Sequence, residues 1–258
     1  MKYVISAPAA SIQQTIYLPS SKSISNRMLV IRAMAGSQAA LLNLSESDDT
    51  RVLEKALEEN SLLKDVGHAG TSMRFLTAFL CTRKGDFQLT GSERMKQRPV
   101  GPLVDALKQL GARIEYLENQ GYPPLRIVGG GLIGGAIEIN AGISSLFISA
   151  LMMIGPVLPG GLLITLKGDI VSSSYIEMTL ALMNLCGVRA RFEGHQIHIP
   201  SGTYTLDEFV VESDWSAASY WFQAAALSTG AEILLPRLSR ESLQGDSTLT
   251  GLFSSLGV

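Results

Sequence analysis

Apolar and polar positions follow one order that recurs along the chain. A strand-like apolar run leads into small or hydroxyl residues and then into an apolar helical pattern, starting near residues 20, 70, 142 and 213. A second helical pattern begins about 26 to 30 residues after each start. The offset from Gly70 to Arg98 is 28 residues, and so is the offset from Ser144 to Ser172. Fixed offsets of this kind indicate an internal repeat.

The second helices of the later units end alike, in LKQLGA, LMNLCGV and LFSSLGV, where glycine is the usual helix C-cap. Alternating apolar and polar residues follow the first two endings, which predicts a pair of strands. The expected fold class is therefore α/β: repeated βαβαββ-like units with helices packed inside and sheets around them.

The repeat also predicts the domains. Residues 20–212 hold three units and should form one complete domain, whereas 1–19 and 213–258 should form an incomplete part of a second domain. The first unit is abridged, because the stretch from Glu59 to Gly67 has no room for a hairpin. The fourth unit lacks its closing strands after Gly257, so we expect the native chain to continue; the alternative is that the last helix ends the native fold.

Composition excludes several classes of protein. Of 258 residues, 46% are hydrophobic and 17% are charged, which predicts a large core. A net charge of -2 does not favour a nucleic-acid surface. Two cysteines, Cys81 and Cys186, and three scattered histidines favour neither a disulfide scaffold nor a zinc site.

One segment raises the question of a membrane span. Residues 146–166 carry no charge over a length that would suffice for a spanning helix, about 20 residues. Gly155-Pro156 and Pro159-Gly160-Gly161 interrupt it, so the prediction is helix, turn and buried strand. The N-terminal sequence shows no signal peptide, and we expect a cytoplasmic protein without a membrane segment.

The segment LPSSKSISNR, residues 18–27, opens an apolar helix. Lys22 in the first turn opposes the helix dipole, which is understandable if an anion binds the free amides there. Ser23 and Arg27 are four residues apart, so Arg27 would reach the same ligand. The alternative is a solvated Lys and Arg on an exposed turn.

The sequence of Gly70 to Arg74 repeats this design. Glycine allows a ligand to approach the backbone, and the helix start supplies N–H donors, although Gly-Thr-Ser is also an ordinary capping sequence. Arg98 precedes a proline and is expected to be extended, in a position suited to bind phosphate or carboxylate. The alternative is an ion pair at the rim with a nearby acid such as Glu93.

Hydroxyl clusters mark two further helix starts, Ser144-Ser145 and Ser172 to Tyr175. Hydroxyls and helix-start amides bind anions without a fixed cation. Several such starts at one edge of a repeated fold predict substrates with several negative charges. The chain has no P-loop, Rossmann or G-x-S-x-G motif.

At these residues the sequence resembles the EPSP synthase family, the 3-phosphoshikimate 1-carboxyvinyltransferases. The matching stretches are LPSSKSISNR, SESDDTR, GHAGTSMR, QRPVGPLVDALKQLGA, GYPPLRI, ISSLFISALMM, SSSYIEMTLALMNLCGV and ESDWSAASYW. The resemblance implies two domains of three units each, with the active site between them. It also implies transfer of the enolpyruvyl group of phosphoenolpyruvate to the 5-hydroxyl of shikimate 3-phosphate, through a tetrahedral intermediate and without metal or cofactor.

The resemblance further assigns roles to individual residues. Lys22 would contact phosphoenolpyruvate and assist proton transfer. The other contacts would be Gly70 and Arg98 to phosphoenolpyruvate, Ser144, Ser145 and Ser172 to the 3-phosphate of shikimate 3-phosphate, and Ser23, Arg27 and Tyr175 to the rest of that molecule. The expected partners are these two small molecules, with no nucleic acid and no membrane, and the chain is expected to be a monomer.

Three departures from the family pattern are apparent. Leu146 replaces the Gln of S-S-Q and cannot donate a hydrogen bond. His68 replaces the usual Asn of G-N-A-G-T, and the family chain is longer, with proton-transferring carboxylates in its second domain. A non-catalytic module that only binds shikimate 3-phosphate is therefore the main alternative.

Two other families share a related architecture and rank lower. The enolpyruvyl transferase that acts on UDP-N-acetylglucosamine usually has a cysteine in the loop that is 92–97 here, and this loop has none. The RNA-terminal phosphate cyclases would be expected to show a more basic surface and a catalytic histidine.

Overall fold

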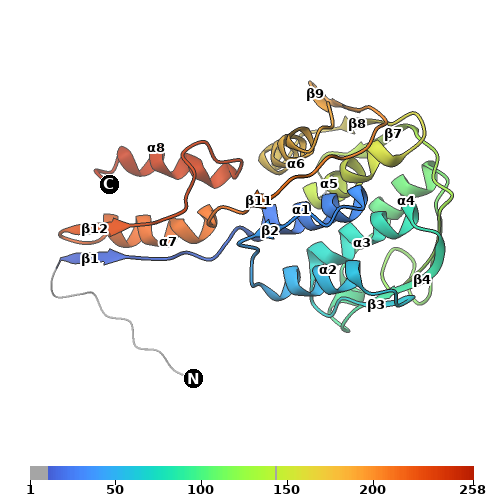
Figure 1. The fold of residues 1–258 in the computed structure, drawn as a ribbon, viewed down its shortest axis with the longest axis horizontal. Coiled ribbons are helices and arrows are strands. Elements are labelled where there is room, and N and C mark those ends of the chain that lie inside the picture. The colour runs from blue at the N-terminus through green and yellow to red at the C-terminus, as the bar shows by residue number, and fades with distance from the viewer. Residues whose placement is uncertain (1–10, 143) are drawn as a thin grey trace.

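The computed structural model describes residues 11–142 and 144–258, so residues 1–10 of the predicted 1–19 segment lie outside the described part. Figure 1 shows a larger body, which runs from α1 to β11, and a smaller body made of β1, β12, α7 and α8. Two extended segments connect them. They meet in an antiparallel bridge between Ser20 and Ser213, and the amide of Asp214 donates to the carbonyl of Pro19 at 2.8 Å.

The helices of the larger body form two sets. The bounds are α1 (Lys22–Ala35), α2 (Asp48–Glu58), α3 (Gly70–Thr82), α4 (Gly101–Gln109), α5 (Ser145–Ile154) and α6 (Ser173–Leu185). The first helix of each unit lies in the interior: α3 is buried from Gly70 to Cys81 and α5 from Phe147 to Ile154. The second helices are amphipathic; α2, for example, buries only Thr50, Leu53 and Ala56, which share one face.

Two four-stranded sheets have the same topology. One has the order β3-β4-β6-β5 and the other β7-β8-β10-β9, each with one parallel pair followed by antiparallel strands. The bounds are β3 (Leu63–Asp65), β4 (Gly85–Thr90), β5 (Arg113–Tyr116), β6 (Leu125–Gly129), β7 (Gly135–Asn140), β8 (Leu162–Lys167), β9 (Arg191–Glu193) and β10 (Gln196–Ile199). The predicted α/β class with βαβαββ units is confirmed.

The first unit has a different sheet. Between Glu59 and Gly67 the chain forms only β3, which joins the sheet of the next unit. The short strand β2 (Leu41–Leu42) pairs instead, in parallel, with β11 (Phe209–Val210), which follows the third unit. Strand β11, at the end of the larger body, thus forms a two-stranded sheet with β2 near the beginning of that body.

The uncharged segment forms a helix, a turn and a strand, as the sequence predicts. Helix α5 passes into the 3-10 turn η2 (Gly155–Val157), and β8 follows. None of the helices in residues 11–142 and 144–258 is long and apolar enough to cross a membrane.

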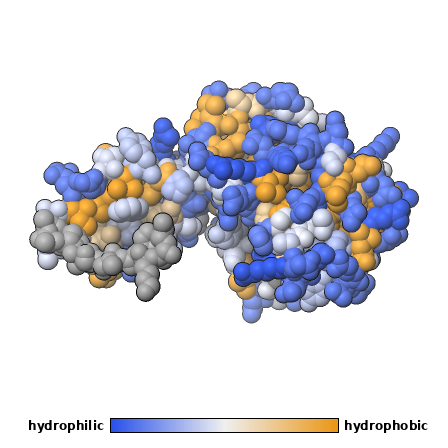
Figure 2. Space-filling view, turned by 90° about the horizontal axis from the view of Figure 1, so that it is seen from below, coloured by the Kyte–Doolittle hydropathy of each residue, from blue (hydrophilic) through white to orange (hydrophobic). Residues whose placement is uncertain are grey.

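The smaller body has little core of its own. Strands β1 (Ile12–Thr15) and β12 (Ala231–Leu234) pair in parallel beside α7 (Trp215–Ala226), while η3 (Gly245–Thr248) leads into α8 (Leu249–Ser254). Helix α7 buries only Trp215 and Ala218, and α8 buries none of its residues. Figure 2 shows apolar surface on both bodies and an indentation between them. The domain boundary near residue 212 stays a prediction.

Candidate functional site

The starts of α1, α3, α5 and α6 come together around one buried arginine. Arg27 is 1% exposed, and its guanidinium donates from Nε to Thr179 Oγ1 at 2.7 Å and from Nη2 to Ser149 Oγ at 3.0 Å. The rings of Phe75 from α3 and Tyr175 from α6 lie 5.6 and 5.7 Å from its central carbon. We call Arg27, Ser149 and Thr179 the Arg27 cluster.

The hydrogen bonds of the Arg27 cluster are mutually consistent. Thr179 Oγ1 donates to the carbonyl of Tyr175 at 2.7 Å, so the Ser149 hydroxyl, 2.8 Å away, is assigned as donor to Thr179. Arg27 Nη1 also donates to the Ser23 carbonyl at 2.9 Å. Burial lowers the pKa of Arg27 to about 10, against a smaller upward effect of Tyr175, so the guanidinium stays charged at neutral pH.

Three predicted site residues lie one helical turn above this cluster. Each of them precedes one member of the Arg27 cluster by four positions: Ser23 precedes Arg27, Ser145 precedes Ser149, and Tyr175 precedes Thr179. Residues four apart stack on one helix face. All three are half-buried, nearer the helix starts than the cluster beneath them. The structure therefore brings Ser23, Arg27, Ser145 and Tyr175 to one end of the helix layer.

Ser144 and Ser172 are the N-caps of α5 and α6, and both are exposed. The Ser144 hydroxyl accepts from the amide of Leu146 at 3.4 Å. Ser172 has φ +64°, a left-handed conformation that is costly for a residue other than glycine, and its hydroxyl does not cap α6. The half-buried Leu146 side chain packs against the core.

Arg98 lies directly over Gly70. A Cβ atom built on Gly70 would be 2.8 Å from Arg98 Cζ, so only glycine leaves room for the guanidinium there. Arg98 is extended before Pro99, with φ -98° and ψ 120°, as the sequence predicts. Lys22 is exposed as the first residue of α1 and forms no ion pair within residues 11–142 and 144–258.

The start of α3 already holds a carboxylate. Asp49 accepts hydrogen bonds from the amides of Thr71 at 3.4 Å and Ser72 at 3.2 Å, and from the Ser72 hydroxyl at 2.8 Å. The amides of Thr71 and Ser72 are therefore occupied by Asp49. Gly70 and the adjacent Arg98 remain the candidates for binding a ligand at this helix start. The sequence pattern did not indicate Asp49, because it caps a helix other than its own.

Arg74 is a second buried arginine, which the sequence analysis included in the motif from Gly70 to Arg74 without assigning it a role. It donates to the Pro99 carbonyl at 3.0 Å and lies 5.9 Å from the ring of Phe147, linking α3 to the loop of Arg98 and to α5. Burial and, less strongly, the charge of Arg98 lower its pKa to about 10, whereas Asp49 raises it. Its spacing of four from Gly70 was the available signal.

His68 is hydrogen-bonded to the loop that carries Arg98. Its Nδ1 lies 2.8 Å from Ser92 Oγ, and the amide of Ser92 donates to the carbonyl of Gly67 at 3.0 Å. The histidine that replaces the usual asparagine thus joins the turn before α3 to the loop after β4.

Neither thiol is placed to act as a nucleophile. Cys81 and Cys186 are 2% exposed, and burial raises the pKa of Cys81 to about 12 and that of Cys186 to about 11. In the folded protein at pH 8, we expect a thiol reagent such as Ellman's reagent to label neither cysteine, whereas both should react in denaturant. Rapid labelling of the folded chain would contradict this burial.

The repeated topology places the chain among α/β proteins built from βαβαββ units, here with polar helix starts gathered at one end. The chain belongs to the EPSP synthase family. The sequence model of EPSP synthase (3-phosphoshikimate 1-carboxyvinyltransferase) matches residues 53–257.

Relatives and solved structures agree with this assignment. The chain is 52% identical to a 3-phosphoshikimate 1-carboxyvinyltransferase of Bacteroides fragilis strain YCH46, over 100% of this chain and 63% of the relative. It is 40% identical to the enzyme of that name from Photobacterium profundum, over 97% of this chain and 65% of the relative. The solved EPSP synthase of Acinetobacter baumannii has the same fold, with a TM-score of 0.75 at 22% identity over 88% of this chain and 57% of that structure. The chain thus spans less than two thirds of the length of these proteins.

Proposed function

We propose that the chain takes part in transferring the enolpyruvyl group of phosphoenolpyruvate to the 5-hydroxyl of shikimate 3-phosphate, and that it carries the shikimate 3-phosphate site. The observation that carries the proposal is the convergence of Ser23, Ser145 and Tyr175 over the Arg27 cluster. The family membership supports the reaction, because the relatives are named for it. The reaction would occur in the cytoplasm, in a monomer whose residues 20–212 form one domain.

The proposed roles are those that the family resemblance implies, and charge and exposure support them. The exposed hydroxyls of Ser144 and Ser172, with Ser145, would hold the 3-phosphate at the starts of α5 and α6. Ser23 and Tyr175 would contact the rest of the molecule. The resemblance implies a contact from Arg27 as well, but Arg27 is 1% exposed and bonded within the Arg27 cluster, so we propose that it acts from beneath through its positive charge.

Phosphoenolpyruvate would bind at the neighbouring helix starts. Its phosphate would pair with the Arg98 guanidinium beside Gly70, because charge-assisted bonds to a planar guanidinium are strong. Lys22, without an ion pair among the described residues, would contact the same molecule and assist proton transfer. The reaction would need no metal or organic cofactor.

A module that binds shikimate 3-phosphate without turnover is the second candidate, because the chain spans 63% of the length of its relative. Release of inorganic phosphate from the two substrates separates the candidates. Phosphate release that requires both substrates supports the transferase, and saturable binding without release supports the module.

Binding is tested by calorimetric titration of the chain with shikimate 3-phosphate in a phosphate-free buffer. We expect one-to-one saturation, with affinity reduced about tenfold by Ser145→Ala, since one bond to a charged group contributes about 1.5 kcal/mol. Ser201→Ala changes an exposed serine beyond β10 and should leave affinity unchanged. Absence of binding to a folded sample, or equal losses in both variants, would contradict the proposed site.

A further inference from the structure

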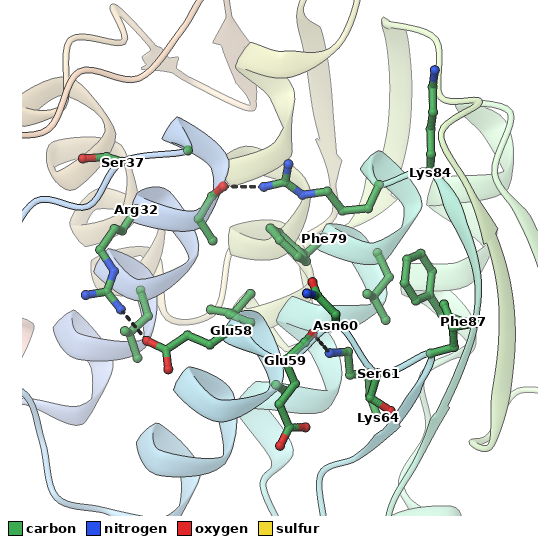
Figure 3. A pocket seen from close by; sticks show the side chains of 18 of the residues that line it. Arg32, Ser37, Glu58, Glu59, Asn60, Ser61, Lys64, Phe79, Lys84 and Phe87 are labelled. Atoms are coloured by element: carbon green, nitrogen blue, oxygen red, sulfur yellow. Dashed lines mark hydrogen bonds and ion pairs between the residues drawn. The ribbon is translucent and has the colours of Figure 1, made fainter.

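A groove on the larger body, lined by the ends of three helices, lies away from the candidate site. A cavity of about 650 Å³ opens where α1, α2 and α3 end (Figure 3). Its walls include Arg32 and Gly36 at the end of α1, Glu58 at the end of α2 and Phe79 in α3. The volume is in the range of small-molecule sites, roughly 300 to 1,000 Å³.

The basic side chains that line this cavity outnumber the acidic ones. Glu58 pairs with Arg32 at 3.5 Å, and Glu59 pairs with Lys55 at 3.6 Å, so both acids of the lining are already engaged. Lys64 and Arg83 also line the cavity, and neither forms an ion pair in the part of the chain that the structure describes. The cavity therefore has an excess of positive charge.

Lys64 is the more informative of these two cations because it is only 4% exposed. Its ammonium donates to the Glu59 carbonyl at 2.6 Å, which uses one of its three N–H groups on a neutral acceptor. Burial lowers the pKa of Lys64, and nearby Glu59 raises it by less. A buried ammonium without a paired carboxylate is costly, and an anion in the cavity would offset that cost.

Arg83 also donates a hydrogen bond to a neutral acceptor, from its Nη2 to the carbonyl of Ala33. Its guanidinium lies 4.6 Å from the centre of the Phe79 ring. Four further N–H groups remain on this guanidinium, and Lys64 and Arg83 approach the cavity from different elements. Because both cations line the same cavity, an anionic group bound in it would be attracted to both.

The lining also includes apolar side chains, two of them aromatic. Phe79 is 6% exposed and Phe87 is half-buried, and Leu29 and Leu80 lie in the same wall. Figure 3 shows the Phe79 ring next to Asn60 and the Phe87 ring farther to the right. Phe87 and Leu62, which is 56% exposed, leave apolar surface open that an inorganic ion would not cover, whereas a ring attached to the anionic group would cover it.

We propose that this cavity binds a small carboxylate with an apolar six-membered ring, with the carboxylate between Lys64 and Arg83 and the ring against Phe79 and Phe87. The site is separate from the candidate site, because Lys22 and Gly36 stand at opposite ends of the 14-residue helix α1. At 1.5 Å per residue, the two ends are about 20 Å apart.

Benzoate is the probe that tests this proposal, with benzamide as its uncharged counterpart and inorganic phosphate as an anion without a ring. By calorimetric titration of the full chain, benzoate should saturate at millimolar concentration or below, and benzamide and phosphate should each bind at least tenfold more weakly. Arg83→Gln should weaken benzoate binding at least fivefold. Arg113→Gln is the matched control, since Arg113 is an exposed arginine on β5 that does not line the cavity.

Amide chemical shifts of the unaltered chain locate the site even if Arg83→Gln does not fold. Benzoate should shift the amides of Ser37, Asn60 and Ser61 and leave those of Ser145 and Tyr175 in place. No saturation, equal binding of benzamide or phosphate, equal effects of the Arg83 and Arg113 variants, or shifts centred on Ser145 would each overturn the proposal.

Discussion

Replacing Arg27 by alanine is expected to lower the free energy of unfolding by about 3 to 5 kcal/mol. The change leaves a cavity in place of the largest fully buried side chain and removes the donor to Ser149 Oγ and the Nε donor to Thr179 Oγ1. Denaturant unfolding monitored by circular dichroism measures the effect. Because the loss acts on folding, a weaker ligand affinity of Arg27→Ala could not by itself be assigned to a lost contact.

Arg32→Ala is the matched control for this change. Arg32 lies in the same helix, and its ion pairs with Glu54 and Glu58, both at 3.5 Å, reach the surface, where such pairs contribute about 1 kcal/mol or less. Arg27→Lys should recover part of the stability, because lysine keeps the positive charge. The recovery should be incomplete, because an ammonium cannot reproduce the directed bonds of a guanidinium. A loss below about 1 kcal/mol in Arg27→Ala would show that the Arg27 cluster does not hold the helix starts together.

Gly70→Ala is expected to weaken phosphoenolpyruvate binding at least tenfold, provided that the proposed role of Arg98 is right. The added methyl group would occupy the position of the guanidinium, whose Nη2 and Cζ lie 2.7 and 2.8 Å from it, and would displace Arg98 from the start of α3. The fold should tolerate the change, because alanine is favoured over glycine within a helix. Titration with phosphoenolpyruvate in the presence of shikimate 3-phosphate measures the affinity.

A double-mutant cycle distinguishes this mechanism from a general disturbance of α3. If Gly70→Ala acts by displacing Arg98, it should have little further effect in a chain that already carries Arg98→Ala. Additive losses in the double variant would mean that the methyl group acts on the ligand or the helix directly, and unchanged affinity in Gly70→Ala would contradict the placement of Arg98.

Local chemistry in the sequence predicted much of the fold. The offset of 28 residues from Gly70 to Arg98 and from Ser144 to Ser172 reflects two sheets of identical topology, and the Gly-Pro and Pro-Gly-Gly breaks ended α5 where expected. Capping residues mark helix starts because their side chains bond amides only two or three positions away. Such signals are contained within a few residues of sequence.

Contacts between distant residues explain what could not be predicted. The sequence places Ser23 and Arg27 on one face, but only the fold brings Thr179, which is 152 residues away, to Arg27. The pairing of β2 with β11 and the capping of α3 by Asp49 are likewise invisible to periodicity. Hydroxyls at Ser149 and Thr179 inside apolar helices were the one signal of a buried polar partner.

The pairing of β1 with β12 has a consequence for the order in which the chain folds. These strands are 219 residues apart in sequence, so forming them first would require closing a very long loop. Once the larger body is folded, the bridge between Ser20 and Ser213 leaves only about 20 residues of connecting chain, which lowers the closure cost by about 2 kcal/mol. The larger body should therefore fold first and bring β1 and β12 close enough to pair.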